Sequence, residues 1–196
     1  MGVKLVSASA GSVEIVAPTT ASNYTATLPA GTGSLVVNGV NSSIVSGSAT
    51  ASTSGTSIDF TSIPSWVKRI TVMFNGVSTN GTSNLLIQLG NSGGVVTSGY
   101  VSQAQNTTGG TRSTAGFILT QEMTAAALLY GQFILSLQSS TTNAWTQNGA
   151  INKNDNVMPF SAGALTTMAS VCTTVRITTV NGTDTFDAGS INILYE

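Results

Sequence analysis

The side chains that could carry acid-base or nucleophilic chemistry are few. The chain has no histidine, seven acidic residues and one cysteine, Cys172. A Ser-His-Asp or Cys-His arrangement and the most frequent zinc ligand are therefore excluded, and an enzyme of this sequence would depend on carboxylates. Asp184 and Asp187 form the closest acidic pair in the sequence, and a glycosidase needs two carboxyl groups roughly 5 to 9.5 Å apart. Both follow Asn181-Gly182, where short polar side chains bond nearby backbone, so we predict a structural role in a turn.

The remaining reactive groups are scattered. Asp59, Glu122 and Asp155 are isolated in the sequence, which predicts no acidic metal cluster. Cys172 is expected to be a small buried hydrophobe on a strand. The glycine-rich pieces GNSGG and NTTGG lack the Lys-Ser/Thr of a phosphate-binding loop and are expected to be turns. The sequence thus predicts a non-enzymatic protein with no catalytic, cofactor or metal site.

Aromatic side chains are the other candidates for binding. Tyr100 and Trp145 stand among polar residues, so they are candidate ligand-stacking residues at a rim. Trp66 lies in phase with Ile70, Val72 and Phe74, which favours packing in the core or between subunits over ligand stacking.

The composition restricts the class of partner. Six basic and seven acidic residues in 196 give a net charge of -1, and charged residues make up 7% of the chain against a usual value near ~25%. Only Lys68 and Arg69 form a basic pair, so nucleic-acid binding is not expected. The N-terminal apolar run is too short for a secretory signal, and no stretch approaches the length of a membrane span, so we expect neither export nor membrane insertion.

The elements that would position these residues read as strands. Five Asn-Gly pairs, at 38-39, 75-76, 80-81, 148-149 and 181-182, are typical of hairpin turns. Apolar residues alternate with polar ones in WVKRITVMF and FILSL, as in half-buried strands. About eight or nine strands are expected after residue 57, in an antiparallel β-sandwich or jelly roll. The clearest predicted hairpin runs from SVCTTVRITTV through Asn181-Gly182 to the C-terminus, and TQEMTAAALLYG is the one helical candidate.

The first 52 residues are predicted to form a separate part. Residues 41–57, NSSIVSGSATASTSGTS, are of low complexity and are expected to be a linker. Pro18 and Pro29 bracket TTASNYTATL and disfavour a central strand, so the segment is expected to be an extended arm. The predicted boundaries are an arm and linker over 1–52 and a sandwich over 53–196.

Residues 11–37, GSVEIVAPTTASNYTATLPAGTGSLVV, resemble a short module of bacteriophage tail-fibre and virion-associated proteins. The matching positions are Ala17-Pro18, Ala21-Ser22, Thr27-Leu28-Pro29, Gly31-Thr32-Gly33 and Leu35-Val36-Val37. Segments at 63–90, 98–100 and 175–196 are similar to a β-rich domain that recurs in phage and prophage structural proteins. The two regions cover most of the chain.

This resemblance implies a virion component without catalytic residues, expected to be a homotrimer whose arm attaches it. The candidate attachment residues are Pro18, Tyr24, Leu28, Pro29, Leu35 and Val37. Two locations stay open. A capsid decoration or cement protein would contact the major capsid protein, whereas a short tail-fibre tip would join a tail adaptor and recognise a host surface glycan. A polysaccharide depolymerase is disfavoured because carboxylates are scarce.

Overall fold

The computed structural model describes residues 3–6, 12–15, 44–125, 127–155 and 157–196. The chain divides into two compact units, Met1–Leu35 and Val36–Glu196. In the first unit, β1 (Val3–Val6) pairs antiparallel with β2 (Ser12–Ile15). The candidate attachment residues Pro18, Tyr24, Leu28, Pro29, Leu35 and Val37 lie outside the described residues.

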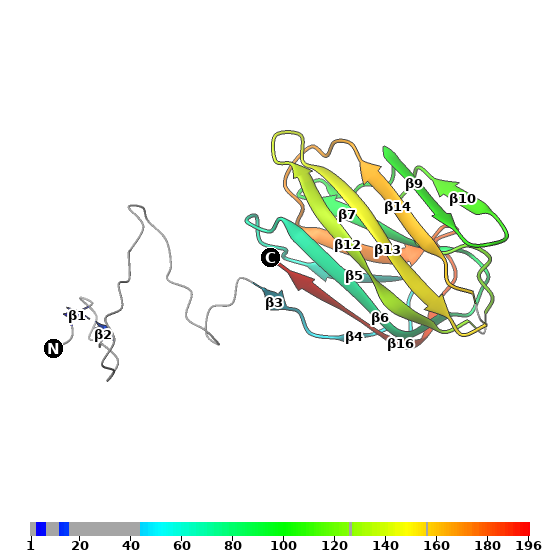
Figure 1. The fold of residues 1–196 in the computed structure, drawn as a ribbon, viewed down its shortest axis with the longest axis horizontal. Helices are drawn as coiled ribbons and strands as arrows, with labels where there is room; N and C mark the ends of the chain where they lie inside the picture. Colours follow the sequence, from blue (N-terminus) through cyan, green and yellow to red (C-terminus); the bar gives the residue numbers. More distant parts are fainter. Residues whose placement is uncertain (1–2, 7–11, 16–43, 126, 156) are drawn as a thin grey trace. The chain divides into compact units, whose positions relative to one another are not determined.

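The second unit consists of two antiparallel sheets that face one another (Figure 1). The larger sheet has the order β10-β9-β14-β13-β12-β6-β16-β3, with β4 also beside β16. Its strands are β3 (Val45–Ser46), β4 (Thr50–Ala51), β6 (Arg69–Thr79), β9 (Tyr100–Gln105), β10 (Gly110–Ser113), β12 (Leu129–Ser139), β13 (Ala144–Lys153), β14 (Phe160–Leu165) and β16 (Phe186–Tyr195). The smaller sheet contains β5 (Ser57–Thr61), β7 (Leu85–Asn91), β8 (Gly94–Val95), β11 (Phe117–Ile118) and β15 (Thr174–Thr179). The predicted all-β antiparallel sandwich is confirmed.

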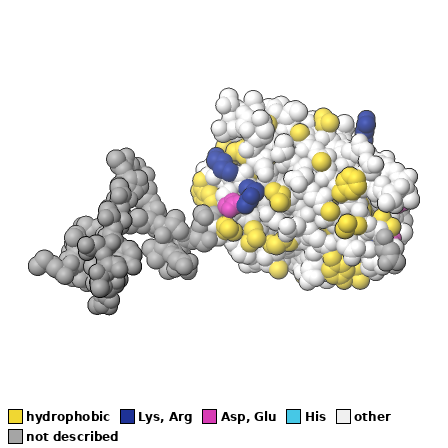
Figure 2. Space-filling view, viewed as in Figure 1, with side chains coloured by type: hydrophobic (Ala, Val, Ile, Leu, Met, Phe, Trp, Pro, Cys, Tyr) yellow, Lys and Arg dark blue, Asp and Glu magenta, His cyan; other side chains and the backbone are white. Residues whose placement is uncertain are grey.

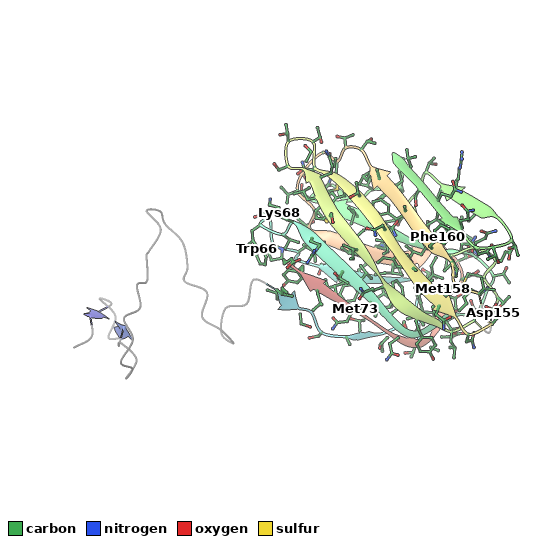
Figure 3. All side chains as sticks on the ribbon, viewed as in Figure 1. Trp66, Lys68, Met73, Asp155, Met158 and Phe160 are labelled. Atoms are coloured by element: carbon green, nitrogen blue, oxygen red, sulfur yellow. The ribbon has the colours of Figure 1, made fainter. Side chains whose placement is uncertain are left out.

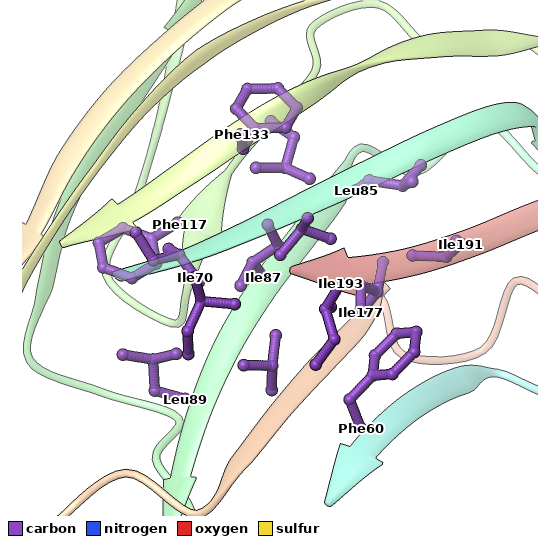
Figure 4. Packing of buried hydrophobic residues seen from close by; sticks show 14 of the residues in the cluster. Phe60, Ile70, Leu85, Ile87, Leu89, Phe117, Phe133, Ile177, Ile191 and Ile193 are labelled. Atoms are coloured by element: carbon purple, nitrogen blue, oxygen red, sulfur yellow. The ribbon is translucent and has the colours of Figure 1, made fainter. Parts of the chain in front are cut away.

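Period-two alternation explains the core between the sheets (Figure 4). Ile70, Val72 and Phe74 point inward from β6, and Val175 and Ile177 point inward from β15. The strand β7 differs, because every residue from Leu85 to Gly90 is buried. On the second face of β7, Leu86 packs with Ala104 and Ile118 in a small separate cluster.

The described Asn-Gly pairs do not close hairpins, contrary to the prediction. Asn75-Gly76 lies within β6 and Asn148-Gly149 within β13. Asn80-Gly81 lies between β6 and β7, which belong to different sheets, and Asn181-Gly182 lies between β15 and β16, which also belong to different sheets. The predicted C-terminal hairpin is therefore wrong. Asn-Gly supplies positive φ, and a bulge or a loop between sheets uses that conformation as readily as a hairpin does.

The predicted helix at TQEMTAAALLYG is also wrong. Residues 119–125, 127 and 128 have no helical assignment, and the segment leads into β12. The Thr120 hydroxyl does not cap a helix, because it accepts a hydrogen bond from the Leu85 amide at 2.9 Å. Met123 and Ala127 enter the core, and Lys153 Nζ donates to the Glu122 carbonyl. The segment is thus held mainly by tertiary contacts, and the Ala127 amide donates to the Thr124 carbonyl at 3.0 Å in a single turn.

The C-terminal strand, β16, pairs with β3 and β4, the first two strands of the sandwich. β16 lies between β6 on one side and β3 and β4 on the other. Ser52 is buried, and its hydroxyl donates to the Ala188 carbonyl at 2.7 Å. Residues 45–52 therefore lie along the sheet edge, where the sequence had predicted a linker.

Candidate docking face

The outer face of the larger sheet is the broadest candidate surface. The register aligns one outward-facing row across the strands from β6 to β10: Thr71, Ile134, Asn148, Ala162, Gln103 and Arg112. The next row contains Met73, Gln132, Ala150, Phe160 and Gln105. Apart from Arg112, these side chains are amides, hydroxyls, small residues and exposed hydrophobic groups. We call this surface the docking face (Figure 2).

The exposed charged side chains on the strands of this sheet lie toward its two sides. Arg69, on β6, forms an ion pair with Glu196 beside β16. Arg112 lies on β10, the edge strand at the other side of the sheet. The opposite face of the sandwich is different, because there Arg176 and Asp59 form a bidentate ion pair at 2.6 and 2.7 Å. The middle of the docking face, formed by the outward residues of β12 and β13, is therefore uncharged.

A groove of about 320 Å³ crosses β10, β9 and β14 on the docking face. It is lined by Val101, Ser102, Gln103, Arg112 and Ala162, and we call it the Arg112 groove. Phe160, 55% exposed, precedes Ala162 by two residues on the same face of β14, and the exposed Met158 lies nearby (Figure 3). The groove thus combines one cation and an amide with apolar walls.

Arg112 has no carboxylate partner among the described residues. Its Nε donates to Gln103 Oε1 at 3.2 Å, and Gln103 Nε2 donates in turn to Gln105 Oε1 at 3.4 Å. By contrast, Arg69, Lys153 and Arg176 each form an ion pair. The Arg112 guanidinium therefore leaves charge and donors available to a ligand.

A second, smaller hollow of about 80 Å³ lies at the other side of the sheet. It is lined by Ile44, Arg69, Thr71, Leu194, Tyr195 and Glu196, next to β3. Because the strand order places β3 at one end and β10 at the other, the chain enters the sandwich on the side away from the Arg112 groove.

Of the acidic pair, Asp184 has the structural role in a turn that the sequence predicted, whereas Asp187 lies on a strand. Asp184 Oδ2 accepts a hydrogen bond from the Ser83 amide at 2.9 Å, and Asp184 Oδ1 accepts one from Asn181 Nδ2. Asp184 thereby links the loop that follows β6 to the loop that follows β15. Asp187 is exposed on β16. Within the described part of the chain, no three His, Cys, Asp or Glu side chains are grouped as a metal site.

The expected rim positions of Tyr100 and Trp145 are wrong. Tyr100 is 1% exposed and packs edge-on against Phe117 with ring centroids 4.9 Å apart. Its hydroxyl accepts from the Leu89 amide at 2.8 Å, and burial raises the pKa of this hydroxyl. Trp145 is 2% exposed and belongs to the core. Both rings face inward because they occupy the inner phase of β9 and β13.

Of the two packing roles predicted for Trp66, the position in the core is wrong, and packing between subunits stays a prediction. Trp66 is 51% exposed and contacts Tyr195, with ring centroids 5.8 Å apart. A turn in which the Val67 amide donates to the Pro64 carbonyl precedes β6, so the alternation of the strand does not extend back to Trp66. Val67 is buried in its place.

The sequence reasoning missed the Arg112 groove. The sequence feature that could have indicated it is the strand FSAGAL, in which Phe160, Ala162 and Ala164 share the outer phase.

Comparison of the chain with protein-family profiles, with curated proteins and with solved structures finds no match. Among the described residues no helix is long and apolar enough to cross a membrane.

Proposed function

We propose that this chain is a non-enzymatic structural protein of a bacteriophage particle, a homotrimeric decoration protein that binds the major capsid protein through its N-terminal segment. The observation that supports it is the arrangement of the larger sheet. β3 and β4 pair with β16 at one side of the sheet, where the chain enters, whereas β10 is the edge strand at the other side, next to β9 and β14. In an attached domain, the side where the attaching segment enters is separate from the side that faces solvent.

The uncharged middle of the docking face, on β12 and β13, supports self-association. Met73, Ile134 and Leu194 are half-buried apolar residues on the outer phase of the neighbouring strands β6, β12 and β16. Closed symmetry is the usual way in which such surface is buried between copies. Met73→Lys should convert the trimer to a monomer in sedimentation equilibrium, and Thr61→Lys, on the exposed edge of the smaller sheet, should not. A trimer that survives Met73→Lys would contradict this interface.

Attachment is tested with two truncations. Removal of residues 1–43 keeps β3 and β4, so the sandwich should melt as the full chain does but should no longer join particles that lack the wild-type copy. Removal of residues 1–52 also takes Ser52 and the strands that cover β16, so it should lower the melting temperature. Normal incorporation of the 1–43 deletion would refute attachment through this segment.

A short tail-fibre tip is the second candidate, and the Arg112 groove favours it because a tip must present a receptor site. The number of copies per particle separates the two, since decoration needs hundreds and a fibre a few dozen at most. Quantitative mass spectrometry of purified particles provides this number. Localisation to the virion is common to both.

A further inference from the structure

The Arg112 groove has the composition of a carbohydrate site. Its floor is made by the small residue Ala162 and by the backbone of β9, so a flat ring can approach the sheet closely. Val101, which is 68% exposed, and the ring of Phe160 provide apolar contact for the C–H face of a sugar. Gln103 and Gln105 supply donors and acceptors for hydroxyl groups.

The charge of the groove indicates an acidic ligand. Arg112 provides a planar guanidinium, which binds carboxylates in a bidentate fork, and no described carboxylate neutralises it. Gln103 accepts a hydrogen bond from Nε of Arg112, and no other side-chain partner of this guanidinium is found among the described residues, so its two terminal nitrogens remain available to a carboxylate. One cation among uncharged groups can bind one carboxylate while the neighbouring groups contact uncharged parts of the ligand. This arrangement fits a ligand whose negative charges are far apart.

The geometry favours a saccharide over a peptide. Peptide side chains are recognised in separate apolar pockets, and an added strand needs a long free edge. The groove has one shallow floor, and β10 is only four residues long. We propose that the Arg112 groove binds an acidic saccharide, with Arg112 on the sugar carboxylate and Phe160 against the pyranose face. This site does not depend on whether the protein decorates a capsid or a tail.

The test uses the full chain and a short oligogalacturonate as the probe. Isothermal titration should detect binding, and ¹⁵N chemical-shift changes should map to Val101, Gln103 and Ala162. The fully methyl-esterified oligomer has the same rings without the carboxylate charge, so it should bind at least about ten-fold more weakly, as expected for loss of a charge-assisted contact. A polyglutamate peptide should not bind. Equal binding of the methyl ester, or preferential binding of polyglutamate, would overturn the proposal.

Variants then assign the contact to Arg112. Arg112→Gln should weaken binding of oligogalacturonate about ten-fold or more. Lys68→Gln removes the same charge from an exposed lysine without an ion pair outside the groove, and it should leave the affinity unchanged. Ala162→Leu fills the floor, keeps Arg112 and should also abolish binding, which covers the case in which Arg112→Gln fails to fold. Equal losses in Arg112→Gln and Lys68→Gln would show non-specific attraction and refute the site.

Discussion

The bulge that β6 and β16 share should make two glycines respond very differently to the same substitution. Gly76 and Gly189 both have positive φ, +65° and +86°. The register of β6 with β16 shifts beside Gly189. A Cβ on Gly189 would lie 2.3 Å from the Gly76 carbonyl oxygen and 2.6 Å from that of Asn75. A Cβ on Gly76 would meet the Tyr130 hydroxyl at 3.4 Å, an ordinary contact.

The expected magnitudes follow from this contrast. At Gly76, alanine pays the cost of positive φ, about 1 kcal/mol. At Gly189 the two strands must also separate, because the obstacle is backbone on the paired strand, and we expect at least about 3 kcal/mol. For a chain of this size these values correspond to about 2 to 4 °C and at least about 6 °C in melting temperature.

Urea unfolding followed by tryptophan fluorescence measures the free energy of unfolding of each variant. Gly76→Ala is the matched control, because it makes the same chemical change at positive φ within the same bulge. If the two variants lose equal stability, the close approach of β16 to β6 at this bulge is not what requires glycine, and the reasoning fails.

Three further predictions concern the two tryptophans, the buried cysteine and the exposed carboxylate of Asp155. Trp145→Ala should cost about 3 to 5 kcal/mol in urea unfolding and Trp66→Ala less than about 1, and the reverse order would contradict the burial. Burial raises the pKa of Cys172 to about 11, so Ellman's reagent should label it only on unfolding. Stability should also fall above about pH 9, where the unfolded thiol ionises first, and Cys172→Ala should reduce this fall. The hydrogen bond from Lys153 lowers the pKa of Asp155, so this carboxylate stabilises the fold above its ordinary pKa of 3.8 and loses that effect as the pH falls. In Asp155→Asn, the melting temperature should therefore decrease less steeply at acidic pH.

Local pattern predicted the strands well because burial against one core imposes period two. Ile70, Val72 and Phe74 alternate as the sequence indicates, and they are all buried. The pairing of strands was not predicted, since β15 and β16 follow one another yet join opposite sheets. Asn181-Gly182 could not distinguish a hairpin from a crossing between sheets, because both need only a residue that accepts positive φ.

The candidate site was harder to predict than the fold. Trp145 shares its phase with Gln147 and Ile151, so hydropathy did not separate the inner from the outer side of β13. Gln147 is buried because Ser161 donates to its side-chain oxygen, a partner distant in sequence. Arg112 lies beside Gln103 and Ala162 only because β10 pairs with β9 and β9 pairs with β14. The groove therefore arises from sheet order, which no local pattern encodes.

Sheet order also makes attachment and ligand binding separable. β3 and β16 come from the two ends of the sandwich sequence and lie together, whereas β9, β10 and β14 come from its middle and form the other side of the same sheet. A change confined to one side leaves the hydrogen bonds of the other intact, so Arg112→Gln should bind particles normally and the 1–43 deletion should bind oligogalacturonate normally. Coupled loss of both properties in either variant would mean that one surface serves both. The two-sided arrangement, on which the proposed display role depends, would then be wrong.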